Sequence, residues 1–299
     1  MLLVSRFWAV FALNLKAIVE MQKFKKLVAL ALICTTFSMI GAGDANAVRV
    51  SMKRIIFEGG VRSEILTLIN NTSETQTYRL GWRKYKMDER ESLRALEDDK
   101  DVGDILWADK MLRFAPRRVS IPAGSSQQIR ILLRRPADIQ EAEYRSHLWI
   151  VTESKPEKFN LETADDNGQA IRLSVQPAIS LPIFVRHGNL SSTASITDMK
   201  TTKNGQGFNL SFTLNRTGTS SLYGDLDIIC ADSGKNTVLR QIRGISVYTE
   251  IDKRYLDFDV PLSAATTPSC NNVEIEYRSD PNDPQLKGVT LATASTSLN

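Results

Sequence analysis

The residue types that most often carry chemistry are scarce in this chain. Its 299 residues include two histidines, His147 and His187, and three cysteines. A His/Cys metal cluster usually needs about four such ligands, and a nucleophile triad needs a histidine base held by an acid. With so few of these residues, we expect no metal, no cofactor and no catalytic residues, and we expect that the protein is not an enzyme.

The carboxylates are the other candidates for chemistry. Eight acidic residues lie between Met87 and Ile105, without any period-2 alternation. A pair of carboxylates at a suitable distance could hydrolyse a glycosidic bond, and that alternative predicts a large pocket with perturbed carboxyl groups. Acidic runs are more typical of solvated surfaces, so we interpret 87–105 as a loop or a short exposed helix.

The first 47 residues have the layout of a secretory signal. From Met21 the chain has a basic start, then an apolar run from Leu27 to Ile40, then Ala45-Asn46-Ala47. This order predicts a signal peptide that begins at Met21 and is cleaved after Ala47, with residues 1–20 as an upstream extension. Neither apolar tract has the roughly 18 residues that a membrane-spanning helix needs.

Removal of this segment changes the charge and the cysteine count. Residues 1–47 hold five of the 38 basic and two of the 34 acidic side chains, which leaves 33 and 32. A balanced charge argues against nucleic acid as a partner. Two cysteines, Cys230 and Cys270, remain in an exported chain, and an oxidising compartment favours a disulfide between them.

The mature chain has the pattern of an all-β protein. Apolar residues alternate with polar ones in short runs, and turn signals such as Asn70-Asn71 and Asn204-Gly205 separate the runs. The pattern restarts after His187, so we expect two Ig-like β-sandwich domains, 48–187 and 188–299. A long polar interruption, 153–170, predicts a connection ahead of the last strand of the first domain.

The most unusual stretch is IRLSVQPAISLPIFVRHG, residues 171–188. Its odd positions are apolar except Pro177, while several even positions are polar. A strand of this length is too long for a small sandwich to cover fully, and Pro177 and Pro182 suit an edge because proline donates no ladder hydrogen bond. Two interpretations remain: a long core strand, or an apolar edge that is lent to another chain.

Five segments resemble, in order and spacing, the PapD-like periplasmic chaperones of pilus assembly, and specifically their archaic chaperone-usher branch. They are VRVSMKRIIFEGG (48–60), LTLINNT (66–72), LRFAPRRVSIPAGSSQQIRILLRRPAD (112–138), EYRSHLWIV (143–151) and AISLPIFVR (178–186). The resemblance covers the first mature domain. The second domain matches only in size and strand content.

The resemblance implies two Ig-like domains in an L-shaped (boomerang) arrangement and a mechanism called donor-strand complementation. In that mechanism the chaperone lends its long edge strand to a pilin subunit that lacks one strand, and it then delivers the subunit to an outer-membrane usher. The implied donor residues are Ile171, Leu173 and Val175, with Ile179 and Leu181 as further candidates. For each of these, burial in the protein's own core is the alternative.

The family also binds the carboxylate at the subunit's C-terminus with a pair of basic residues. The MKRIIFEGG match assigns the first of them, on the first strand, to Arg54. The second is usually a lysine near the end of the long strand, where this chain has Pro182, so Arg186, Arg172 or Lys53 would have to replace it. An arginine suits this task because its planar fork holds a carboxylate through two hydrogen bonds.

The sequence therefore predicts a periplasmic chaperone that binds pilin subunits, prevents their aggregation and delivers them to an outer-membrane usher. We expect no small-molecule substrate. The alternative is a structural Ig-like component of a pilus or a cell surface.

Overall fold

The computed structural model describes residues 48–90, 93–97, 105–153, 176–205, 207–232, 235–262 and 270–298. All of them belong to one compact unit, Ala47–Asn299. The predicted signal peptide and four predicted site residues, Ile171, Arg172, Leu173 and Val175, lie outside the described residues. Within the described part, no helical segment has both the length and the apolar character that crossing a bilayer requires.

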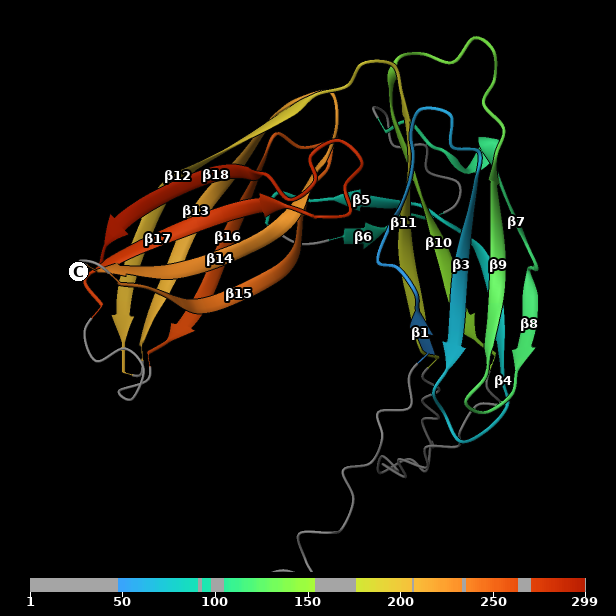
Figure 1. Cartoon of the computed structure of the whole chain (residues 1–299), viewed down its shortest axis with the longest axis horizontal. Coiled ribbons are helices and arrows are strands. Elements are labelled where there is room, and N and C mark those ends of the chain that lie inside the picture. Colours follow the sequence, from blue (N-terminus) through green and yellow to red (C-terminus); the bar gives the residue numbers. More distant parts are fainter. Residues whose placement is uncertain are drawn as a thin grey trace, which may run out of the picture. The chain divides into compact units, whose positions relative to one another are not determined.

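The protein is all-β, as the alternation predicts, and two sheets form the first sandwich (Figure 1). The four-stranded sheet has the order β1-β3-β9-β7, with bounds Val48–Val50, Ser63–Asn70, Ser126–Leu133 and Leu112–Ala115. The five-stranded sheet has the order β2-β11-β10-β4-β8, with bounds Ile55–Phe57, Ala178–His187, Ala142–Thr152, Gln76–Arg83 and Arg118–Ile121. A short 3-10 helix, Asp109–Met111, precedes β7.

The core of the first sandwich lies between these two sheets. Leu66, Leu68 and Ile131 of the four-stranded sheet pack against Leu148 and Ile183 of the five-stranded sheet, all at 0% exposure. These residues sit at alternate positions of their strands, so each strand buries one face. The period-2 pattern of the sequence is thus the pattern of burial.

A second sandwich follows after Gly188, with two more sheets. The three-stranded sheet has the order β12-β13-β16, with bounds Ser192–Asn204, Gly207–Gly218 and Lys253–Pro261. The four-stranded sheet has the order β15-β14-β17-β18, with bounds Lys235–Val247, Leu222–Asp232, Asn272–Ser279 and Thr290–Ser297. A separate core, which includes Phe208, Leu210, Ile228 and Ile275, fills the space between them.

The predicted disulfide is confirmed. Cys230 at the end of β14 bonds to Cys270, which lies just before β17, and their Cα atoms are 5.8 Å apart. Both residues belong to the core of the second sandwich. The bridge therefore joins two neighbouring strands of one sheet across 40 residues of sequence.

Part of the acidic stretch 87–105 differs from the loop or short exposed helix that the sequence predicts, and residues 91–92 and 98–104 lie outside the described residues. Leu93–Ala95 forms β6, which pairs with β5, Tyr85–Met87, as a small antiparallel hairpin. The side chain of Met87 is buried against Tyr248 of the second sandwich and Phe184 of β11. The hairpin forms because residues far along the chain cover it, and no local periodicity reports such contacts.

The disulfide leads to a stability prediction. Replacing Cys230 and Cys270 together by serine should lower the free energy of unfolding by about 2–4 kcal/mol, because a loop of this length is no longer closed in the unfolded chain. Urea unfolding of the oxidised wild type and of the double variant measures the difference. Equal midpoints and equal slopes would contradict the prediction.

Candidate functional site

Strand β11 has a strand partner along its whole length on one side and along only part of it on the other. It pairs with β10 from Ala178 to His187, whereas the short strand β2 pairs with it only from Ile183 to Val185. Among the described residues, Ala178–Pro182 therefore has an open side. The predicted edge strand is an edge over this stretch, but not at 183–185, where β2 covers it.

On one face of β11, the side chains are less buried toward the N-terminal end of the strand. Leu181, Ile183 and Val185 are at most 1% exposed and belong to the core of the first sandwich. Ile179, two residues earlier on the same face, is only partly buried. Leu181 thus fills the protein's own core, which was the alternative to its donor role, while Ile179 lies where the core ends.

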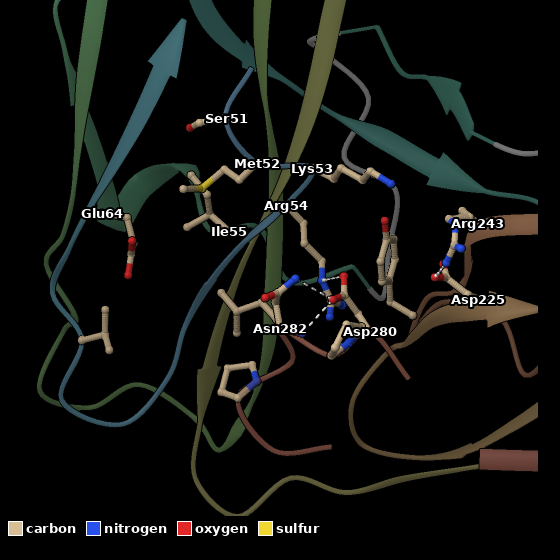
Figure 2. Close-up of a pocket in the computed structure, with 15 residues that line it drawn as sticks. Ser51, Met52, Lys53, Arg54, Ile55, Glu64, Asp225, Arg243, Asp280 and Asn282 are labelled. Atoms are coloured by element: carbon tan, nitrogen blue, oxygen red, sulfur yellow. Dashed lines mark hydrogen bonds and ion pairs between the residues drawn. The ribbon is translucent and has the colours of Figure 1, made fainter. Parts of the chain in front are cut away.

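Arg54 lies in a segment that crosses from one sheet to the other. Strand β1 ends at Val50 in the four-stranded sheet and β2 begins at Ile55 in the five-stranded sheet. Arg54 is therefore not in the first strand, as the sequence match implies, but immediately before β2. It lines a cleft of about 720 Å³ between this segment and residues of the second sandwich, among them Tyr223, Asp225, Arg243 and Asp280 (Figure 2).

The guanidinium of Arg54 faces two aspartates. Its Nη2 donates a hydrogen bond of 3.1 Å to Asp283 Oδ2, and its Nε lies 3.8 Å from Asp280 Oδ2. The ring of Tyr223 covers one face of the guanidinium at 4.1 Å. The Arg54 side chain is only 6% exposed, so these contacts hold it against the second sandwich.

Arg186 stands in a buried network next to Arg54. Its Nε donates to Glu143 Oε2 at 3.0 Å, and its Nη1 lies 3.5 Å from Asp283 and 3.7 Å from Glu58. Burial by itself lowers the pKa of the Arg186 guanidinium, but Glu143, Asp283 and Glu58 outweigh it and hold that pKa above its ordinary value. Arg186 thus stays charged at the joint between the sandwiches.

Glu143 and Asp283 each contact an arginine and also accept hydrogen bonds from other residues. Glu143 Oε1 accepts hydrogen bonds from the N–H and the hydroxyl of Ser221 in the second sandwich. Burial alone raises the pKa of Asp283, but Arg186, the N–H groups of Leu286 and Gln285, and Arg54 hold it below its ordinary value. The joint therefore contains two cations, Arg54 and Arg186, and four carboxylates.

These contacts separate the three candidates for a second anion-binding residue. The Arg186 side chain is 3% exposed, and three carboxylates of the same chain, Glu143, Asp283 and Glu58, already lie within ion-pair distance of its guanidinium. Lys53 is exposed, lines the cleft and makes no ion pair with another described residue. Figure 2 shows Lys53 extending to the side of the cleft on which Arg243 and Asp225 lie. Arg172 lies outside the described residues.

A second set of contacts between the sandwiches involves residues that the sequence did not single out. Both Nη atoms of Arg145 on β10 donate to the carboxylate of Glu250, at 2.9 and 2.8 Å. Glu250 also accepts a hydrogen bond from the N–H of Met87, and Tyr248 stacks on Arg145 at 4.0 Å. No sequence motif indicates this cluster, because its members lie up to 163 positions apart.

His147 lies beside this cluster on β10. It is fully buried, its ring is 4.8 Å from that of Tyr85, and neither ring nitrogen has a hydrogen-bond partner among the described residues. Burial and the nearby charge of Arg145 lower its pKa to about 3. Within the described part of the chain, His147 is therefore a buried, neutral ring that packs against Tyr85.

Among the described residues, one group has the spacing of metal ligands: Cys230, Asp232 and Cys270. The two cysteine sulfurs are bonded to each other in the disulfide. They therefore offer no thiolate to a metal.

No protein-family model matches this sequence, and no curated protein does. Among solved structures, the chain is similar to the class 5 fimbriae chaperone CfaA, at 15% identity over 85% of this chain and 99% of that chain, with a TM-score of 0.38. It is also similar to a chain of the CsuC-CsuE pre-assembly complex of Acinetobacter baumannii, at 10% identity over 83% and 97%, with a TM-score of 0.44. The Pseudomonas aeruginosa chaperone CupB2 has 11% identity over 84% and 100%, with a TM-score of 0.40.

The buried network leads to a prediction for stability. Replacing Arg186 by methionine should lower the free energy of unfolding by about 3–5 kcal/mol, because Glu143 loses its cation while it stays buried. Glu143→Gln keeps an acceptor for Ser221, so the double variant should be more stable than the sum of the two single effects predicts. Denaturant unfolding of the four proteins gives the coupling, and strict additivity would contradict it.

The buried histidine leads to a prediction for pH dependence. In the unfolded chain His147 takes up a proton near pH 6.5, whereas in the folded protein it does so only near pH 3. Stability should therefore fall as the pH drops from about 6.5 toward 3, with this group contributing up to about 1.4 kcal/mol per pH unit. His147→Leu removes the contribution, and an unfolding series from pH 7 to 5 in which both proteins have the same slope would contradict it.

Proposed function

We propose that this protein is a periplasmic chaperone that binds pilin subunits by donor-strand complementation, keeps them from aggregating and delivers them to an outer-membrane usher. In this proposal residues 48–187 form the chaperone domain with the donor strand, and residues 188–299 form the second Ig-like domain. The ordered sequence motifs of the first domain, of the archaic chaperone-usher type, support it together with the site geometry.

The observation that carries the proposal is the change in side-chain burial along β11. The face that fills the protein's own core at Leu181, Ile183 and Val185 is only partly buried at Ile179. In the sequence, the period-2 pattern of apolar residues continues ahead of Ile179 at Val175, Leu173 and Ile171, which lie outside the described residues. An apolar pattern that is longer than the stretch buried in the protein's own core suits a partner with an open core.

The open side of β11 supplies the main-chain part of the interaction. Residues Ala178–Pro182 have no strand partner on one side within the described chain, so a strand of a subunit can add there by β-augmentation. Each fully buried Leu, Ile or Val then contributes roughly 1.5–3 kcal/mol before the cost of ordering is subtracted. Ile171, Leu173, Val175 and Ile179 are the proposed donors.

Arg54 is the proposed anchor for the carboxylate at the subunit's C-terminus. An arginine carries five N–H donors, and Arg54 uses one of them in a hydrogen bond to a described residue. It lines the cleft at the foot of β2, the strand that pairs with β11. Lys53, exposed in the same cleft, is the proposed second cation in place of the residue that Pro182 replaces.

Two features support the proposed periplasmic location. The N-terminal segment has the layout of a signal peptide, and the mature chain carries the Cys230–Cys270 disulfide, which persists in an oxidising environment. The proposed action needs neither catalysis nor a cofactor.

The donor strand gives a direct test. Wild-type protein and Leu173→Asp are each purified from the periplasm of the native host, and mass spectrometry identifies what co-purifies. The wild type should recover a small secreted Ig-like subunit at nearly equal amounts, and the variant should recover at least about tenfold less, because a charge replaces an apolar donor.

Ser174→Asp is the matched control, because it places the same charge at a neighbouring polar position of the alternating sequence pattern. It should recover the subunit like the wild type, and all three proteins should unfold at similar temperatures. Equal recovery with Leu173→Asp would contradict strand donation. Recovery of the protein itself in surface fibres would favour the structural alternative.

A further inference from the structure

Asp280 is placed where a ligand carboxylate would approach Arg54. Its Oδ2 lies 3.8 Å from Arg54 Nε, close enough for attraction between the charges but too far for a hydrogen bond. Figure 2 shows the two side chains facing each other in the cleft, joined by the ion pair. The guanidinium edge that carries Nε is therefore occupied by a weakly held carboxylate of the same chain.

Nη2 and one face of the Arg54 guanidinium make closer contacts than Nε does. Nη2 is hydrogen-bonded to Asp283, and the ring of Tyr223 covers one face. Asp283 cannot move away easily, because its Oδ1 accepts hydrogen bonds from the N–H groups of Gln285 and Leu286 while its Oδ2 faces Arg186 as well. The edge that faces Asp280 is thus more open to a ligand than Nη2 or the face under Tyr223.

Asp280 is the more replaceable of the two aspartates. Its side chain is 18% exposed, against 3% for Asp283. Its Oδ1 accepts hydrogen bonds within its own turn, from the main-chain and side-chain nitrogens of Asn282. It lies just after β17, at the start of the connection 280–289 to β18, where a small rotation disturbs no strand pairing.

We propose that Asp280 is an internal competitor for the anion site on Arg54, which a ligand carboxylate must displace, and that Asp283 is the permanent counter-ion. This inference rests on the proposed function for the identity of the natural ligand, a chain-terminal carboxylate. In the free protein Asp280 limits the binding of other anions to the cleft. A carboxylate that brings both oxygens to the unused donors replaces one long ion pair by charge-assisted hydrogen bonds.

The charges around Arg54 indicate that Asp280 competes with a ligand carboxylate rather than helping it to bind. Arg54 and Arg186 face four carboxylates, Glu58, Glu143, Asp280 and Asp283. An additional negative charge is disfavoured there unless one of the four moves away. Two of the four, Asp280 and Glu58, have no hydrogen bond to either arginine within the described residues, and of these two only Asp280 contacts Arg54.

Acetate is a suitable probe, because it presents a carboxylate alone and needs no subunit. The mature protein with ¹⁵N-labelled arginine is titrated with sodium acetate at constant ionic strength, and the NMR signal of the Arg54 Nε–H group is followed. Acetamide, which has the same shape without the charge, is the ligand control. Arg54→Lys identifies the signal by its disappearance.

Asp280→Asn should lower the apparent Kd for acetate by about fivefold relative to the wild type, because the competing charge is gone while the turn can still form. Asp225→Asn is the matched control: it removes a carboxylate from the same cleft, but one that pairs with Arg243 rather than Arg54. It should change the Kd less than twofold, and acetamide should shift the signal in none of the proteins.

Three outcomes would overturn the inference: acetate affinity that is unchanged or weaker in Asp280→Asn, an equal gain in Asp225→Asn, or no response of the Arg54 signal in any protein. The first means that Asp280 positions Arg54, and the second that only the overall charge of the cleft matters. Because acetate is independent of any subunit, failure of the proposed chaperone function is seen separately, in the co-purification with Leu173→Asp.

Discussion

Arg186 and Glu143 face each other on neighbouring strands of the first sandwich, and the second sandwich closes over both of them. Glu143 accepts hydrogen bonds from Ser221, and Arg186 pairs with Asp283, so residues of the second sandwich contact both members of this buried ion pair. Two buried charges tolerate few arrangements, because any displacement leaves one of them without its partner. The cleft that Arg54 lines adjoins this network, since Asp283 contacts both Arg54 and Arg186.

Strand β11 combines two tasks that impose opposite requirements. Its C-terminal half must be buried, and Leu181, Ile183 and Val185 are among the least exposed residues of the first sandwich. Its N-terminal half, from Ala178 to Pro182, has an open side within the described chain, because β2 is only three residues long. The short length of β2 is thus what leaves part of an apolar strand accessible, and the proposed function uses that part.

The cleft contains more negative charge than the sequence-based prediction of an anion-binding site suggests. Arg54, Arg243 and Lys53 line it, but Asp280 and Asp225 lie beside the two arginines. Ion pairs between these residues connect the two sandwiches. In the proposed function, anion binding and the stability of the joint are therefore coupled through Asp280 and Asp283.

The all-β fold, most strand positions and the Cys230–Cys270 pairing could be predicted from the sequence, because alternation and cysteine count depend on local order and on compartment. The residue pattern also directed attention to Arg54 and to the long strand. The burial of Arg186 in an ion-pair network, the place of Leu181 in the core and the β5–β6 hairpin could not be predicted in this way. Arg54 and Asp283 lie 229 positions apart, and no local pattern reports a contact that exists only after two sandwiches have packed together.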